Sequence, residues 1–202
     1  TSKKIELMNA FDFAQYVNDL RNKTEFFVYP QTGTDWQDEV FETASISEVN
    51  TTLKWGSEKA AYTAGFGYLT QDGIVGGSNN NYERYNARIN FQYDILDNLT
   101  LTTNALHFYS TKRNLPEGGN GSVLFSAVNL NPDMPVYNEE GSFYYANKLS
   151  NRDVMNPAAQ VHNASNIHRT SKWTGLAALE YSFWKNFKIK SQFNINHASV
   201  LE

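Results

Sequence analysis

The chain of 202 residues has no cysteine and only five prolines. Without cysteine there is no disulfide framework, no thiolate nucleophile and no cysteine metal site. No apolar run reaches about 18 residues, so the sequence predicts no transmembrane helix. Positive charge is not in excess either, because the formal net charge is -4. Phosphate binding normally needs a basic patch, so a nucleic-acid partner is not expected.

The start of the chain lacks the marks of a complete secreted protein. It has no initiating Met, and its charged opening, Thr1 to Lys4, is not followed by an apolar segment. The sequence therefore predicts no signal peptide. We expect the chain to be an internal or processed piece of a longer protein.

Aromatic residues are frequent in a chain that is polar on average. They make up 14% of the residues, while the mean hydropathy is -0.54. This combination is typical of outer-membrane barrels, which have an apolar outer face, aromatic girdles and a polar interior. A soluble β-sandwich also tolerates it.

Six stretches alternate apolar and polar side chains with a period of two, and two of them are nearly perfect. Side chains in a strand point alternately to opposite faces, so each stretch predicts a strand with one apolar and one polar face. In the first, the apolar face comprises Tyr85, Ala87, Ile89, Phe91 and Tyr93. In the second, it comprises Phe187, Ile189, Ser191, Phe193 and Ile195.

The predicted architecture is all-β, an antiparallel meander that forms part of a large transmembrane β-barrel. One helix precedes it at about 9–22, with Asn9 as N-cap and Asp12 three residues later. The predicted strands are 46–55, 59–70, 84–94, 98–110, 171–183 and 187–198.

The connections between these strands alternate in length. Tight turns are predicted at 56–58, 94–98 and 184–186, and longer loops at 71–83 and 111–170. A connection of about sixty residues is rare in a compact domain. Barrels of the bacterial outer membrane combine short periplasmic turns with long extracellular loops. We therefore expect an extracellular segment at 1–44 and six barrel strands within 45–202.

Four motifs, in order, resemble those of SusC/RagA-type TonB-dependent outer-membrane transporters. The segment 7–18 resembles the helix-containing first loop of that family. Residues 33–41 (G-T-D-W-Q-D-E-V-F) resemble a family signature. The stretch 58–75 is similar to a family strand and loop, and 132–141 (P-D-M-P-V-Y-N-E-E-G) to a second loop.

The resemblance implies an importer in the outer membrane of a Gram-negative, Bacteroidetes-type bacterium. Such a barrel has about 22 strands, of which this chain would supply six near the start. Importers of this type take up oligosaccharides or peptides with a surface lipoprotein lid of the SusD type, driven by the TonB complex. The plug and the TonB box would precede residue 1, so this piece is not expected to transport by itself.

Two groups of aromatic and acidic residues are candidates for ligand binding. One is Trp36 with Asp35, since aromatic rings stack on sugars and carboxylates accept hydroxyl hydrogen bonds. Its structural alternative is a signature that holds the first loop against the barrel wall. The other group lies in the long loop and comprises Asp133, Tyr137, Tyr144 and Tyr145. There, a loop packed on its own side chains is the alternative.

Six polar residues are predicted to face the lumen of the barrel. Charged side chains are tolerated there, whereas Lys or Arg on the lipid face costs roughly 2–4 kcal/mol at mid-depth. A solvated lining is the simplest interpretation, and contact with the plug is the alternative. The six are Arg88, Asn90, Gln92, Glu180, Lys188 and Lys190.

The sequence predicts no catalytic residues, no metal site and no cofactor. The four histidines are scattered, and no nucleophile, phosphate-loop or zinc motif is present. An enzyme is therefore the weakest hypothesis. The main alternative to the importer is a soluble all-β ligand-binding module with a sandwich core. In that case the apolar faces would pack on a second sheet, whereas in a barrel they would contact outer-membrane lipid.

These two hypotheses predict different behaviour for a purified 202-residue piece. Six barrel strands leave two unpaired edges and a bare apolar face, and unpaired edges pair with other chains. We expect aggregation, or order that appears only in detergent, by size-exclusion chromatography with light scattering and by far-UV circular dichroism. A monodisperse β-rich monomer without detergent would favour the soluble module.

Overall fold

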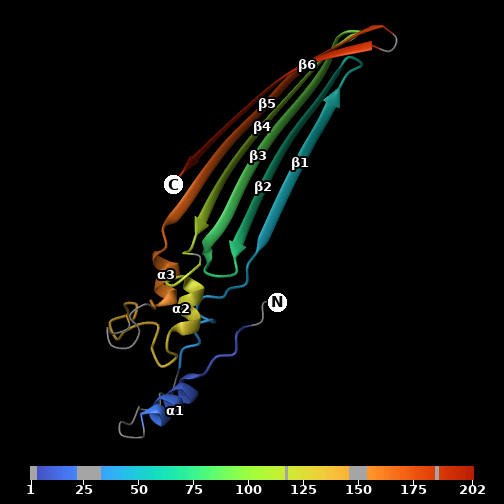
Figure 1. Ribbon diagram of the computed structural model, residues 1–202. Coiled ribbons are helices and arrows are strands. Elements are labelled where there is room, and N and C mark those ends of the chain that lie inside the picture. Colours follow the sequence, from blue (N-terminus) through green and yellow to red (C-terminus); the bar gives the residue numbers. More distant parts are fainter. Residues whose placement is uncertain (1–3, 22–32, 117, 146–153, 185–186) are drawn as a thin grey trace. The chain divides into compact units, whose positions relative to one another are not determined.

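The six predicted strands form one sheet in the computed structural model, which describes residues 4–21, 33–116, 118–145, 154–184 and 187–202. The strands follow one another in the order β1-β2-β3-β4-β5-β6 as an antiparallel meander (Figure 1). Their bounds are β1 (Ile46–Gly56), β2 (Ala60–Gly73), β3 (Gly77–Leu96), β4 (Leu99–Asn114), β5 (Asn166–Trp184) and β6 (Phe187–Leu201). The predicted all-β meander is therefore confirmed.

The predicted N-terminal helix is also confirmed as α1 (Ala10–Leu20). Asn9 caps it, because its side-chain oxygen accepts a hydrogen bond of 2.9 Å from the backbone N–H of Asp12. The cap satisfies one of the backbone donors that the first helical turn leaves without a partner.

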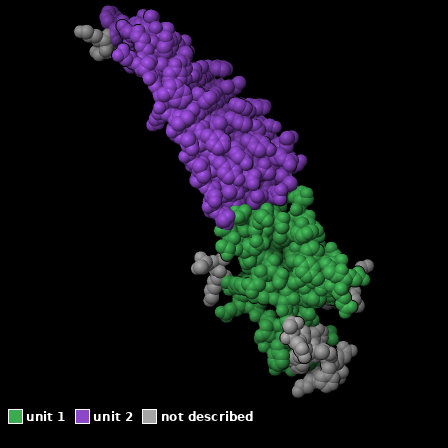
Figure 2. Space-filling view, turned by 180° about the vertical axis from the view of Figure 1, so that it is seen from behind, with its two compact units in different colours: residues 1–44, 72–80, 114–166 green, residues 45–71, 81–113, 167–202 purple. Residues whose placement is uncertain are grey.

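The chain divides into two compact units, shown in different colours in Figure 2. The strand unit comprises residues 45–71, 81–113 and 167–202. The loop unit comprises residues 1–44, 72–80 and 114–166. The loop unit is therefore assembled from three separate stretches of sequence, not from the N-terminal segment alone.

Strand register confirms the predicted division into two faces. Ala87 lies opposite His107, Ile89 opposite Ala105, and Arg88 opposite Leu106. Cross-strand neighbours point to the same face, so the apolar residues of β3 extend across β4. His107 also stacks on Trp173 of β5 with ring centroids 4.0 Å apart. The apolar faces of the β3–β4 and β5–β6 hairpins therefore lie on one side of the sheet.

Aromatic side chains contact one another along this apolar face. The rings of Trp55 and Tyr62 stack 5.4 Å apart, and Tyr62 also contacts Phe91 at 5.0 Å. Tyr68 and Tyr85 lie 4.8 Å apart on the same side of β2 and β3. Such pairs contribute to strand pairing by roughly 0.2–1 kcal/mol each.

Among the described residues of the strand unit itself, none covers its apolar face. Large side chains there stay open, for example Phe193 with 69% and Ile195 with 58% of its surface exposed. A sandwich needs a second sheet over this face, and the described strands all belong to one sheet. The arrangement therefore favours the barrel hypothesis over the soluble sandwich.

The prediction of a long loop at 71–83 is wrong. β2 continues to Gly73 and β3 resumes at Gly77, so residues 74–76 alone connect them. Gly76 and Gly77 have φ values of 75° and 49°, the left-handed conformation that glycine adopts without strain. The Asn80 side chain donates to the Val75 carbonyl at 3.2 Å. This part of β3 was not recognised as a strand, because its residues are polar on both faces and do not alternate with apolar ones.

Two helices missing from the prediction lie in the long connection after β4. They are α2 (Val123–Asn129) and α3 (Pro157–Asn163), and they contact each other. Ser122 caps α2 through its side-chain oxygen, and Asn156 caps α3 in the same way. Each helix has seven residues, fewer than the window in which a helical period can be recognised.

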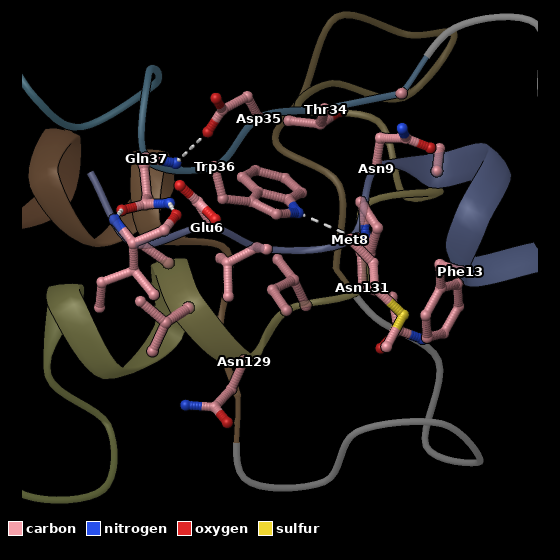
Figure 3. Close-up of a pocket in the computed structure, with 18 of the residues that line it drawn as sticks. Glu6, Met8, Asn9, Phe13, Thr34, Asp35, Trp36, Gln37, Asn129 and Asn131 are labelled. Atoms are coloured by element: carbon pink, nitrogen blue, oxygen red, sulfur yellow. Dashed lines mark hydrogen bonds between the residues drawn. The ribbon is translucent and has the colours of Figure 1, made fainter. Parts of the chain in front are cut away.

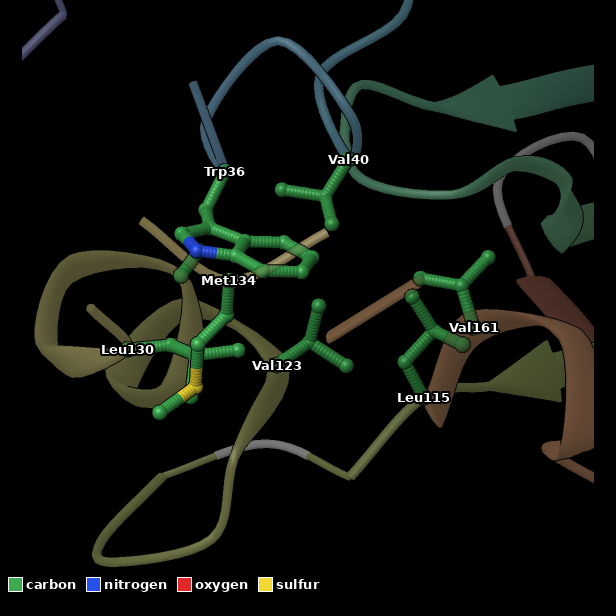
Figure 4. Packing of buried hydrophobic residues seen from close by; sticks show 8 residues of the cluster. Trp36, Val40, Leu115, Val123, Leu130, Met134 and Val161 are labelled. Carbon is green, nitrogen blue, oxygen red and sulfur yellow. The ribbon is translucent and has the colours of Figure 1, made fainter. Parts of the chain in front are cut away.

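A small hydrophobic core holds the loop unit together (Figure 4). It joins the 33–41 segment to the long connection, with Trp36 3% and Val40 0% exposed. Burying one large apolar side chain stabilises a fold by about 1.5–3 kcal/mol. The buried members are Trp36, Val40, Leu115, Val123, Ala127, Leu130, Met134 and Val161.

The tight turn between β1 and β2 is confirmed, with Ser57 donating its backbone N–H to the Ala60 carbonyl at 2.7 Å. β3 and β4 are joined by residues 97–98. The third predicted turn, at 184–186, lies partly outside the described residues. No helix in the described parts is long and apolar enough to cross a membrane.

Neighbouring positions of β6 offer a direct test of the two faces. We expect Ile195→Lys, on the apolar face, to destabilise the full-length protein by about 2–4 kcal/mol in a membrane. Asn194→Lys, on the polar face of the same strand, should change stability by less than about 0.5 kcal/mol. Urea unfolding in lipid vesicles measures both. Equal effects of the two substitutions would contradict the assignment of the faces.

Candidate functional site

The 33–41 signature folds into a tight turn around Asp35. One carboxylate oxygen of Asp35 accepts backbone N–H bonds from Gln37 at 3.0 Å and Asp38 at 3.2 Å. The Phe41 N–H then donates to the Gln37 carbonyl at 2.9 Å. Asp is favoured in such turns because its short side chain can bond the backbone two or three residues further on. The signature therefore encodes a backbone conformation first.

The N-terminal segment is tied to this turn by charge and by an amide clamp. Lys4 contacts the carboxylates of Asp35, at 3.2 Å, and Asp38. The Ile5 N–H donates to the Gln37 side-chain oxygen at 3.0 Å, and the Gln37 amide donates to the Ile5 carbonyl at 2.8 Å. Both amide groups of Gln37 are thus used to fix the backbone of Ile5.

Ion pairing shifts the pKa values of this cluster. The hydrogen bond to Asp38 raises the pKa of Lys4 above its ordinary value, against the opposing effect of burial. Burial raises the pKa of Asp35, but hydrogen bonds from Lys4 and the backbone outweigh it and hold that pKa below its usual range. Both groups are therefore charged at neutral pH, as the ion pair requires.

The other side of the turn binds the chain that follows α2. Thr34 donates its N–H to the Pro132 carbonyl at 2.8 Å and its hydroxyl to the Met134 carbonyl at 2.7 Å. The Trp36 indole N–H donates to the Asn131 carbonyl at 2.9 Å. Trp36 is therefore a buried anchor between two segments. This geometry supports a structural role for the signature, since a stacking platform needs an open ring face, but the signature holds the first loop against the long connection and not against strands of the sheet.

A pocket of about 740 Å³ lies beside this anchor (Figure 3). Three stretches line it, namely residues 4–11 with Phe13, 33–37 and 127–132. Its volume lies within the range of roughly 300–1,000 Å³ that small-molecule sites occupy. Met8 and Phe13 supply apolar surface in Figure 3, while Glu6 and Asn9 supply polar groups. The aromatic and acidic pattern predicted Trp36 and Asp35 at this site, but nothing in the sequence pattern indicated the wall formed by residues 4–11 and Phe13.

The predicted candidate Tyr137 lies in a small hairpin. It pairs with Phe143, and the two rings stack 5.1 Å apart. The Asn138 side chain accepts backbone N–H bonds from Glu140 and Ser142, which closes the turn. Because Tyr137 is 54% exposed, one side of this aromatic pair is open to a ligand or a partner.

The other candidates of the long loop do not form one site with Tyr137. Tyr144 is half-buried against the hydrophobic core, and Tyr145 is exposed. The Asn156 amide donates to the carbonyls of Val136 and Tyr144, so a buried asparagine orders this part of the loop. Asn156 was not among the predicted residues, although an Asn-Pro pair before a helix is a recognisable capping signal.

Among the described acids of this loop, Asp133 is the one whose environment disfavours its charge. Burial raises its pKa above the ordinary value, and one of its carboxylate oxygens is buried without a hydrogen-bond partner. A buried acceptor without a partner costs about 1–3 kcal/mol. The residue is half-buried and lies between the carbonyls that hold Thr34.

All six residues predicted to face the lumen share the polar face of the strand unit. Arg88 donates to the Thr52 hydroxyl at 3.1 Å, across β2. Lys188 forms an ion pair of 2.8 Å with Glu180 on the neighbouring strand. Strand register places Asn90 opposite Asn104, Gln92 opposite Thr102, and Lys190 opposite Glu180. Their position at a lumen remains a prediction.

No group of acidic and histidine side chains in the described residues could hold a metal ion. The polar face and the pocket carry amides, hydroxyls and charges. A hydroxyl and an imidazole meet elsewhere, where His107 lies 3.3 Å from the Ser171 hydroxyl on the apolar side of the sheet, beside Trp173. The amides, hydroxyls and charges of the polar face and the pocket can hold a polar ligand through hydrogen bonds.

Comparisons with known proteins confirm the resemblance inferred from the four motifs. The chain is 29% identical to TonB-dependent receptor P3 of Formosa agariphila, over 95% of this chain and 19% of that protein. It is 26% identical to TonB-dependent receptor SusC of Bacteroides thetaiotaomicron, over 99% of this chain and 19% of that protein. These curated relatives are receptors, and the chain spans less than a quarter of their length. No protein-family model matches the chain.

Solved structures of a peptide importer, RagAB, have the same fold. The closed-closed state matches with a TM-score of 0.69 at 19% identity, over 95% of this chain and 22% of that one. The predicted partial barrel is thereby confirmed as a fold. The predicted localisation, the outer membrane of a Gram-negative bacterium, is confirmed as well.

The raised pKa of Asp133 leads to a pH-dependent prediction. A carboxyl whose pKa is raised by folding stabilises the fold below its unfolded value, 3.8, and loses that contribution as the pH rises through the folded value. At pH 7 the ionised form therefore opposes folding. We expect Asp133→Asn to slow exchange of the Thr34 amide at pH 7, in hydrogen-exchange mass spectrometry, with the difference lost below about pH 4.

Glu139→Gln is the matched control, since it removes an exposed carboxylate from the same loop. It should leave exchange at Thr34 unchanged at both pH values. Faster exchange in Asp133→Asn at pH 7 would contradict the assigned burial cost.

Proposed function

We propose that this chain forms part of the wall and the extracellular loops of a TonB-dependent importer of oligosaccharides or peptides in the outer membrane. The observation that carries the proposal is a six-stranded meander with one uncovered apolar face. Such a face is stable against lipid, and the free edges of β1 and β6 require neighbouring strands. Further strands on either side would close the barrel.

In this proposal the loop unit lies on the extracellular side and meets the ligand or the lid. The relatives support this role, since RagAB is named a peptide importer and SusC a TonB-dependent receptor. A surface lipoprotein of the SusD type and the TonB complex are the partners we infer for the full-length protein. The exposed rings of Tyr137 and Tyr145 are open to such contacts, and the buried Trp36 has a supporting role.

A topology experiment tests the proposal, because the chain has no cysteine of its own. Glu139→Cys lies at the tip of the Tyr137 hairpin, and Ser57→Cys lies in the turn between β1 and β2. We expect intact cells producing a cysteine-free full-length receptor to react with a membrane-impermeant maleimide at Glu139→Cys. Ser57→Cys should react only after permeabilisation of the outer membrane.

Labelling of both positions in intact cells, or recovery of the protein in the soluble fraction, would overturn the proposal. The soluble binding module would then be the better account. Loss of ligand uptake on deletion of the receptor or of the TonB complex tests the transport step separately.

A further inference from the structure

The polar face of the strand unit is strongly cationic, although the whole chain has a net charge of -4. Strand register places seven basic and three acidic side chains on this face. The basic residues are Lys54, Arg84, Arg88, Lys112, Lys172, Lys188 and Lys190, and the acidic ones are Glu48, Asp94 and Glu180. The excess of positive charge is therefore a property of this face and not of the whole chain.

Two of the seven cations form ion pairs within the described part of the chain. Arg84 pairs with Glu48 at 3.5 Å, and Lys188 pairs with Glu180 at 2.8 Å. Within the described part of the chain, the other five form no ion pair, although Lys190 lies opposite Glu180; they are Lys54, Arg88, Lys112, Lys172 and Lys190. Their side chains are exposed.

These five cations are spread along the length of the face. Lys112 lies opposite Tyr82, Arg88 lies opposite Leu106, and Lys54 lies opposite Thr63 beside the turn between β1 and β2. A surface of one charge sign that follows a cleft attracts and guides oppositely charged ligands. Cations at several levels fit a ligand that moves along the face better than a partner bound at one spot.

Gly65 leaves the space that the Arg88 side chain occupies on this face. A Cβ at Gly65 would lie 2.5 Å from the Arg88 Nε, so any larger residue there would displace the arginine. The Arg88 side chain crosses β2 at this gap and donates from one guanidinium nitrogen to the Thr52 hydroxyl at 3.1 Å. A guanidinium held in this way has donors left for a carboxylate or sulfate, which it matches in geometry.

The remaining side chains of the polar face are mostly amides and hydroxyls. Both groups suit sugar hydroxyls, because an amide donates and accepts hydrogen bonds and a hydroxyl does the same. Examples are Asn50, Thr52, Asn90, Gln92, Asn104 and Asn194.

We propose that this face guides an anionic oligosaccharide, one bearing carboxylate or sulfate groups, along the lumen of the importer. The inference rests on the proposed function, because the polar face lines a lumen only in a closed barrel. The five unpaired cations contact the acidic groups, and the amides and hydroxyls contact the sugar hydroxyls.

The test compares two pairs of substitutions on the same two strands of the full-length receptor. Lys112→Gln with Lys172→Gln removes two charges from the polar face. Arg113→Gln with Arg169→Gln, one residue further along β4 and three back along β5, removes two from the apolar side. The probes are sulfated maltoheptaose, unsulfated maltoheptaose and hepta-aspartate, measured by calorimetry on the purified receptor at low and high salt.

We expect the polar-face pair to weaken binding of sulfated maltoheptaose about tenfold, the order expected when two partly screened charge contacts are lost. The apolar-side pair should change it less than about twofold, and high salt should remove the difference. Equal effects of the two pairs, or equal binding of sulfated and unsulfated sugar, would overturn the inference. Tighter, face-dependent binding of hepta-aspartate would overturn the oligosaccharide assignment.

Failure of the proposed function gives a different result. In that case the receptor is absent from the outer-membrane fraction or lacks the heat-modifiable migration of a folded barrel. If the receptor is folded and inserted in the membrane but binds sulfated and unsulfated sugar equally, only the proposal for an anionic ligand is refuted.

Discussion

Alternation of side chains across one sheet is the constraint on which the rest of the structure depends. The alternation is clearest in β3 and β6, which place aromatic and aliphatic residues on one face, and amides and charges on the other. Side chains such as Phe193 and Ile195 then remain exposed. A lipid environment makes this face favourable, and the polar face becomes available for water and ligand.

The loop unit is stabilised differently, because its long connection is not part of the sheet and is ordered by other contacts. The 33–41 turn does this by binding on two sides, to Ile5 through Gln37 and to the 131–134 backbone through Thr34 and Trp36. The buried Trp36 ring provides apolar contacts, and the hydrogen bond from its N–H fixes the orientation of the ring. A rigid support of this kind lets exposed elements, such as the Tyr137 hairpin, be presented to a ligand or a lid.

How much could be predicted from the sequence follows from the range of each interaction. Strands, faces and the α1 cap depend on neighbouring residues, and the alternation around Ile89 and Ile195 predicted them correctly. The strand ends at 71–83 were missed because Asn79, Asn80 and Asn81 are polar on both faces. Two contacts could not be predicted from any local pattern, because each joins residues far apart in the chain. They are the contact of the buried Trp36 with Asn131 and the packing of Arg88 over Gly65.

The most direct measurement asks what the apolar face of β3 contacts in a membrane. Ile89→Cys and Asn90→Cys, adjacent on β3, would each carry a fluorophore in the full-length receptor reconstituted with brominated lipid. The account predicts strong quenching at position 89 and little at position 90, because the two side chains point to opposite faces. Equal quenching at both positions, or quenching only at 90, would contradict a lipid-facing apolar face.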